Sequence, residues 1–185
     1  MSSRKKAILA TIVIFMMSSS RGLTNPVIKL QDSSLENPDL IRIEMTPVDL
    51  LSKPGAKPYL VGSKLRVKMI VKNNSDQRVL VRVINPYYQN RPRLYKDNQL
   101  LPYRSEITRI VRSKDADPEF VSVGDAIFVE PYSSAILKGL ELSDWYGPLL
   151  PGSYRLLNRY RLKIGGAWSA DSAPLFFQVV REEKP

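Results

Sequence analysis

Carboxylates are the first candidates for chemistry in this chain, because its 185 residues include no histidine and no cysteine. Those two residue types supply the commonest general base, the commonest transition-metal ligand and the reactive thiol. The spacing of Asp115, Asp117 and Glu119 is similar to that of calcium ligands, and Asp125 follows nearby. A calcium loop, however, needs a glycine for its sharp turn and a bidentate glutamate at its end. Because Pro118 interrupts the run, we expect a solvated loop and no metal site.

Two acids that are distant in the sequence can still meet in space as a glycosidase pair. This alternative stays open, although a chain of short strands leaves little room for a deep cleft. The sequence therefore predicts a non-enzymatic protein without a cofactor.

A basic segment is the second chemical feature. Residues 78–114 contain nine basic and two acidic residues, whereas the charges of the other residues after position 20 cancel. Tyrosines are interleaved with the cations, and a surface of guanidinium groups and rings suits an anionic partner. The alternative is that the arginines are solvated outward positions of strands and that the tyrosines pack at strand ends. The candidate binding residues are Arg82, Tyr87, Tyr88, Arg91, Arg93, Tyr95 and Arg104.

Aromatic residues in loops are the third feature. Trp145 and Tyr146 precede Gly147 and Pro148, and Trp168 follows two glycines. Loop aromatics can form a stacking platform for sugar rings, or they can cap the end of a core. The sequence favours caps and leaves the sugar platform as an alternative.

The first twenty residues have the pattern of an export signal. Arg4, Lys5 and Lys6 precede an apolar run over residues 7–17, and three serines then offer small residues for cleavage after Ser20. As a helix the run would reach only about 16 Å, against about 30 Å of membrane hydrocarbon. We therefore expect a cleaved signal over residues 1–20 and a secreted or periplasmic protein, with an uncleaved membrane anchor as the alternative. Residues 21–39 are expected to be a flexible leader, and residues 182–185 a charged tail.

Alternating apolar and polar residues, punctuated by turn residues, predict an all-β antiparallel fold. The long strands over 64–72 and 79–84 are expected to pair as a hairpin through the polar turn at Asn73 to Asp76. A second hairpin is expected where 93–95 and 99–101 flank Asp97 and Asn98. The other expected strands are 41–45, 107–111, 120–123, 126–129, 135–142, 154–162 and 175–180.

Three segments resemble the immunoglobulin-like β-sandwich superfamily in its exported bacterial forms. Residues 62–74 look like its B strand and the following turn, residues 150–156 like the Pro-Gly-x-Tyr entry to its F strand, and residues 173–180 like its last strand. The resemblance covers residues 40–181 and implies a sandwich of about seven to nine strands. It also implies a structural role for Tyr154, whose hydroxyl would bond back to upstream backbone. The cysteines that bridge the sheets of antibody domains are lacking.

The resulting hypothesis is an exported, non-enzymatic binding or accessory module with a basic, tyrosine-containing surface. Its expected partner is a protein or an anionic envelope polymer, either a polysaccharide or a lipid surface. One alternative is a carbohydrate-binding module that uses the loop aromatics. Another is a proteinase-inhibitor-like sandwich whose loop from Tyr87 to Arg93 enters a protease cleft. Nucleic acid is not an expected partner, since no nucleic-acid-binding motif is present. A disulfide-linked partner is excluded by the absence of cysteine, and the sequence leaves the oligomeric state open.

Overall fold

The computed structural model describes residues 40–48, 58–117 and 125–181. The predicted signal, leader and charged tail lie outside these residues, as do Glu119 and the strand expected over 120–123. Within the described residues, no helix is both long and apolar enough to cross a membrane.

The described part of the chain is mostly β-structure, as the alternating pattern predicts. Its strands form three sheets with the orders β1-β3-β8, β2-β10-β9-β5-β6 and β4-β7. All neighbouring strands are antiparallel except β2 and β10, which run parallel. The elements are β1 Ile41–Pro47, β2 Tyr59–Leu60, β3 Arg66–Asn73, β4 Val79–Val83, α1 Pro86–Gln89, β5 Arg93–Lys96, β6 Gln99–Leu100, α2 Ser105–Ala116, β7 Asp125–Val129, β8 Ser134–Glu141, α3 Leu142–Tyr146, β9 Gly152–Leu157 and β10 Leu175–Val180.

β3 is the central strand of the first sheet, and its alternation sorts side chains between core and solvent. Val67, Met69 and Val71 are fully buried, while Lys68 and Ile70 between them are half-buried on the other face. The ladder with β8 is irregular between Val67 and Met69, opposite Gly139. A Cβ atom at Gly139 would lie 2.7 Å from the Val67 carbonyl oxygen, so this close approach requires glycine.

The β5–β6 hairpin forms where the sequence predicts it. Its two turn residues have positive φ angles, 48° at Asp97 and 67° at Asn98. Aspartate and asparagine tolerate this left-handed conformation better than other non-glycine residues, which favours a two-residue turn whose twist matches the strands.

The predicted hairpin between residues 64–72 and 79–84 is wrong. β3 pairs with β1 and β8, whereas β4 pairs with β7 in a separate sheet. The buried side chain of Asn73 explains the crossing, because its amide donates to the carbonyl oxygens of Gln77 and Val129 at 2.7 and 3.1 Å. These bonds hold the chain as it passes from the first sheet to the third.

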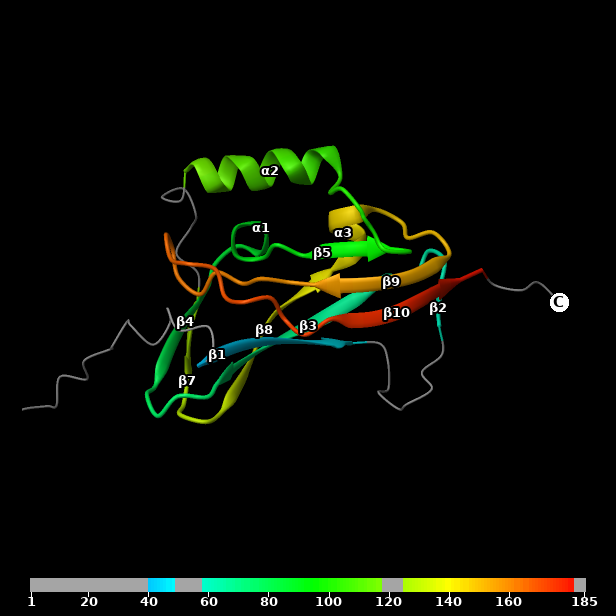
Figure 1. Cartoon of the computed structure of the whole chain (residues 1–185). Coiled ribbons are helices and arrows are strands. Elements are labelled where there is room, and N and C mark those ends of the chain that lie inside the picture. Colours follow the sequence, from blue (N-terminus) through cyan, green and yellow to red (C-terminus); the bar gives the residue numbers. More distant parts are fainter. Residues whose placement is uncertain (1–39, 49–57, 118–124, 182–185) are drawn as a thin grey trace, which may run out of the picture.

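The predicted strand at 107–111 is also wrong, because this segment lies within helix α2. Ile107 and Val111 are buried and stand four residues apart, which places them on one face of a helix. That face packs near α1, and Figure 1 shows α2 lying beyond α1 and β5 at the edge of the molecule. The spacing of these two apolar residues is compatible with a strand and with a helix, and tertiary packing stabilises the helix.

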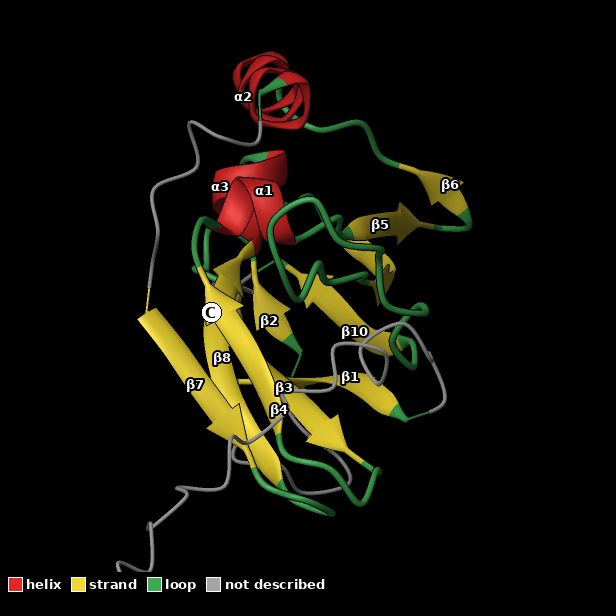
Figure 2. Ribbon diagram, turned by 90° about the vertical axis from the view of Figure 1, so that its left-hand side faces the viewer, coloured by secondary structure: helices red, strands yellow, loops and turns green. Residues whose placement is uncertain are grey.

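A single hydrophobic cluster fills the interior. It joins the inward side chains of β3 and β8 to those of β5, β9 and β10, including Leu94, Leu156 and Phe177. Trp145 on α3 extends the cluster toward the helices, which gather at one end of the strands (Figure 2). The outward side chains of β5, β9 and β10 therefore face away from this core.

Candidate anion-binding site

Five arginines project from one face of the second sheet. Along β9 and its continuation, Arg155, Arg159 and Arg161 alternate with the buried residues Leu156, Asn158 and Tyr160. Along β5 and the residues before it, Arg91 and Arg93 flank the buried Pro92. We call the set Arg91, Arg93, Arg155, Arg159 and Arg161 the arginine face.

Backbone pairing brings the two rows together although about sixty residues separate them. Tyr95 pairs with Arg155 across the β5–β9 ladder. Beyond the ladder, the Arg91 amide donates to the Arg159 carbonyl oxygen at 3.1 Å, and the Arg161 amide donates to that of Gln89 at 2.8 Å. The rows therefore continue side by side past the ends of both strands.

Trp168 lies against three of these arginines. The guanidinium carbon of Arg161 is 4.2 Å from the centre of the Trp168 ring and 4.6 Å from that of Tyr88, so this cation is held between two aromatic faces. The corresponding distances to Trp168 are 4.7 Å for Arg91 and 5.7 Å for Arg159. Cation–π attraction offsets part of the repulsion among like charges.

Two carboxylates neutralise only part of this charge. Asp115 at the end of α2 lies 2.5 Å from Arg91 Nη2 and 3.6 Å from Arg161 Nη1. Asp171 pairs with Arg93 and lies 4.0 Å from Arg159 Nε. Two carboxylates thus pair with four of the five guanidinium groups, and the excess positive charge favours anions.

Several donors of the arginine face are unused. The Nε atoms of Arg93, Arg155, Arg159 and Arg161 are buried and have no hydrogen-bond partner within the described residues. Buried donors without a partner are uncommon in folded proteins, and a functional role is one of the explanations for them. Their side chains lie at a surface, where an incoming anion could displace the present ion-pair partners.

Two tyrosines fix the start of β5. The hydroxyls of Tyr103 and Tyr146 both donate to the Pro92 carbonyl oxygen at 2.7 Å, and that of Tyr146 accepts from the Leu94 amide at 3.0 Å. Burial raises the pKa of both phenols, while Arg91 opposes the rise at Tyr103. Both remain protonated donors at neutral pH and cannot act as general bases.

Only some of the predicted binding residues meet at this face. Arg91, Arg93 and Tyr95 lie on it, and Tyr88 is buried beneath it with its hydroxyl accepting from the Gly165 amide. Three others lie elsewhere: Tyr87 packs against Trp145, Arg82 belongs to the β4–β7 sheet, and Arg104 immediately precedes α2.

Arg155, Arg159 and Arg161 were not among the predicted binding residues, because they lie outside the basic segment of residues 78–114. Their signal was the alternation of arginines within the predicted strand at 154–162.

The burial of Trp145 fits the predicted core cap and not the alternative of a sugar platform. Trp145 is 2% exposed and packs between Tyr87 and Tyr103, with both ring centres at 5.1 Å. Tyr146 is hydrogen-bonded to β5, and Trp168 lies against arginines. These three rings therefore cannot present one coplanar face to a sugar.

The alternative of an inhibitory loop requires an exposed segment from Tyr87 to Arg93, and the structure does not have one. Tyr88, Gln89 and Asn90 are at most 2% exposed. The Gln89 amide donates to the Arg82 and Arg161 carbonyl oxygens, which fixes the segment inside the fold. A segment held in this way cannot enter a protease cleft.

The predicted acidic loop is only partly described. Asp115 is engaged with arginines, Asp117 follows α2, and Asp125 begins β7. Among the residues for which the structure gives positions, no group of three or more His, Cys, Asp or Glu side chains could hold a metal ion.

Comparison with protein-family models finds no match to this chain. A search of curated protein sequences finds no match either.

Proposed function

We propose that this protein is an exported, non-enzymatic binding module that recognises an anionic envelope polymer through the arginine face. The single observation that carries the proposal is the gathering of five guanidinium groups on one sheet surface, where two carboxylates pair with only four of them. Export rests on the basic, apolar and small-residue pattern of the first twenty residues.

The site suits a polymer that carries repeated anionic groups. Arginine presents a planar fork of donors that matches carboxylate, sulfate and phosphate, and Trp168 and Tyr88 hold the guanidinium groups in place before binding. Holding the side chains in advance reduces the entropy lost on binding. An acidic protein surface is the second candidate partner, since it offers carboxylates in the same way.

An immunoglobulin-like sandwich is the scaffold we propose for this site. The inward side chains of the two larger sheets contribute to one hydrophobic cluster, which supports a two-layer arrangement. The Tyr154 hydroxyl donates to the Leu150 carbonyl oxygen at 2.6 Å, the backward bond typical of a tyrosine corner. The module would present the outer surface of one layer to its partner.

Binding to immobilised acidic polysaccharides, and to a neutral polysaccharide, tests the proposal. We expect binding to the acidic polymers only, and weaker binding as salt increases. A double Arg93→Ala and Arg159→Ala variant should bind about tenfold to a hundredfold more weakly, because two charge-assisted contacts are lost.

The matched control removes two exposed cations elsewhere. Arg42 and Lys138 lie on the β1-β3-β8 sheet, and their double alanine variant loses the same net charge. It should bind within about twofold of the parent protein, since remote exposed charges are screened by salt. Equal weakening in both double variants would show that only net charge matters and would refute a defined site.

A further inference from the structure

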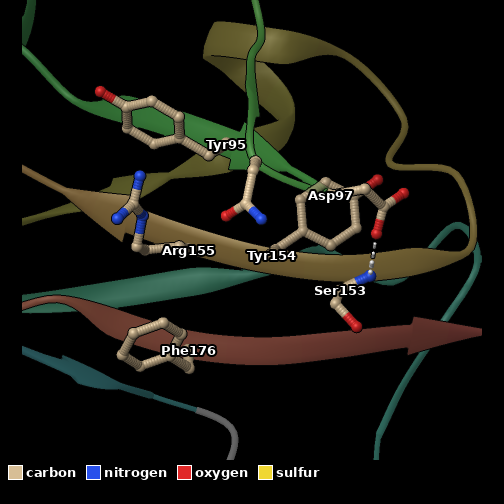
Figure 3. A pocket seen from close by; sticks show the side chains of 7 residues that line it. Tyr95, Asp97, Ser153, Tyr154, Arg155 and Phe176 are labelled. Atoms are coloured by element: carbon tan, nitrogen blue, oxygen red, sulfur yellow. Dashed lines mark hydrogen bonds between the residues drawn. The ribbon is translucent and has the colours of Figure 1, made fainter.

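A depression beside Arg155 lies at one end of the arginine face (Figure 3). Its volume is about 310 Å³, at the small end of the range for ligand sites. β5 and its hairpin turn form one side, and β9 and β10 form the other. The residues used below are Tyr95, Asp97, Asn98, Ser153, Arg155 and Phe176, all of which line it.

Arg155 supplies the cation of this depression. Its guanidinium carbon lies 4.3 Å from the centre of the Tyr95 ring, and its buried Nε has no hydrogen-bond partner among the residues that the structure describes. The other four members of the arginine face pair with Asp115 or Asp171, whereas no carboxylate of the described residues pairs with Arg155. A ligand carboxylate can therefore bind Arg155 without displacing an ion pair.

Phe176 supplies an apolar surface next to that cation. It is the cross-strand neighbour of Arg155 on β10, and 69% of its surface is exposed. Figure 3 shows the Phe176 ring on one side of Arg155 and the Tyr95 ring on the other. An exposed ring can pack against the C–H face of a sugar, and doing so removes apolar area from water.

Polar groups at the other end of the depression can form hydrogen bonds with hydroxyl groups of a ligand. Asp97 Oδ1 accepts from the Ser153 amide at 3.3 Å, which leaves the second carboxylate oxygen available as an acceptor. The side-chain amide of Asn98 and the hydroxyl of Ser153 form no hydrogen bond with any residue that the structure describes. Because Asp97 is itself anionic, this end repels a second negative charge and accepts hydroxyl donors.

We infer that this depression binds one acidic sugar unit, a uronate, of a polysaccharide. The uronate carboxylate lies on Arg155, its ring packs on Phe176, and its hydroxyls bond to Asp97 and Asn98. This inference rests on the proposed function, in which the arginine face holds an anionic polymer. The inference adds the chemical class of the repeating unit. The depression should prefer a unit that carries both a carboxylate and hydroxyls over a polymer that carries charge alone.

Calorimetric binding of the purified protein to three polymers tests the inference. The probes are polygalacturonate, the same polymer with its carboxyl groups reduced to alcohols, and polyphosphate. Polygalacturonate should bind, and its reduced form should not. Phe176→Ala should weaken polygalacturonate binding about tenfold and polyphosphate binding less than about twofold, because only the sugar uses the ring.

Phe128 provides the matched control. It is a 48% exposed phenylalanine on β7 with the Arg78 guanidinium 4.0 Å from its ring centre, so its surroundings resemble those of Phe176. Phe128→Ala should leave polygalacturonate binding unchanged. Thermal unfolding of both variants checks that they fold, which we expect because both rings are largely exposed.

The outcomes separate the inference from the proposed function. If Phe176→Ala and Asp97→Asn leave polygalacturonate binding unchanged while the Arg93 and Arg159 double variant still loses it, the uronate site is refuted and the arginine face stands. Equal effects of Phe176→Ala on polyphosphate and polygalacturonate would also refute the uronate site. If neither polyanion binds the parent protein, both proposals fail.

Discussion

Replacing Asn73 by alanine should destabilise the protein more than any exposed substitution. The side chain is 1% exposed. Its amide donates to the carbonyl oxygens of Gln77, Val129 and Glu130 at 2.7, 3.1 and 3.1 Å. Its carbonyl oxygen accepts from the amide and the hydroxyl of Ser75 at 3.0 and 2.6 Å. Alanine would lose all of these bonds.

The magnitude follows from which bonds are buried. The bonds to Val129 and to both Ser75 groups are buried, whereas those to Gln77 and Glu130 are only partly so and can recruit water. The Ser75 hydroxyl can donate to the Gln77 carbonyl oxygen instead, at 3.1 Å, so two buried groups lose their partner: the Val129 carbonyl oxygen and the Ser75 amide. At about 1 kcal/mol each, the loss is about 2 kcal/mol in the free energy of unfolding. For a chain of this size, the midpoint of thermal unfolding should fall by about 4–8 °C.

Asn74 provides the control, because it is the adjacent asparagine and is exposed. Asn74→Ala should change the free energy of unfolding by less than about 0.5 kcal/mol. Urea unfolding followed by circular dichroism measures both variants. If Asn73→Ala were no more destabilising than Asn74→Ala, the result would refute the role of the buried Asn73 bonds in holding the chain between the sheets.

Three further predictions concern packing, pH and the arginine face. Gly139→Ala should cost about 1–3 kcal/mol in urea unfolding, since the new Cβ would lie 2.7 Å from the Val67 carbonyl oxygen. Burial raises the pKa of Tyr146 above its ordinary value of 10.0. Just above pH 10 the phenol therefore loses its proton in the unfolded chain but keeps it in the folded protein. The free energy of unfolding should fall as the pH rises further. Tyr146→Phe, which loses the bond to Pro92, should lower stability by about 1 kcal/mol at pH 7 and flatten that alkaline fall. Asp171→Asn should tighten binding to an acidic polysaccharide, since it frees two guanidinium groups; unchanged or weaker binding would argue against the arginine face.

The longer strands were readable from the sequence where one face is buried and the other is exposed to solvent, whereas the two-residue strand β2 was not predicted. In β3 every second residue from Val67 to Val71 is apolar, and this local alternation is all that a half-buried strand requires. The β5–β6 turn was readable for a similar reason, because Asp97 and Asn98 are residues that tolerate positive φ.

Pairing and helix α2 were not readable in this way. Alternation places a side chain in or out of the core but says nothing about which strand lies beside it, so β3 and β4 were joined wrongly as a hairpin. The spacing from Ile107 to Val111 suits either a short strand or one face of a helix, and packing near α1 decides between them.

For the candidate site too, the sequence determined some features and the tertiary structure determined others. The sequence by itself determined that histidine and thiol chemistry are absent, that the basic charge is concentrated, and that arginines alternate along two segments. Only the tertiary structure decided that Arg91 lies beside Arg159 and Arg161 around Trp168, and that Trp145 is buried. The physical reason is range: side-chain type and alternation are local properties, whereas neighbours across a sheet depend on the packing of the whole core.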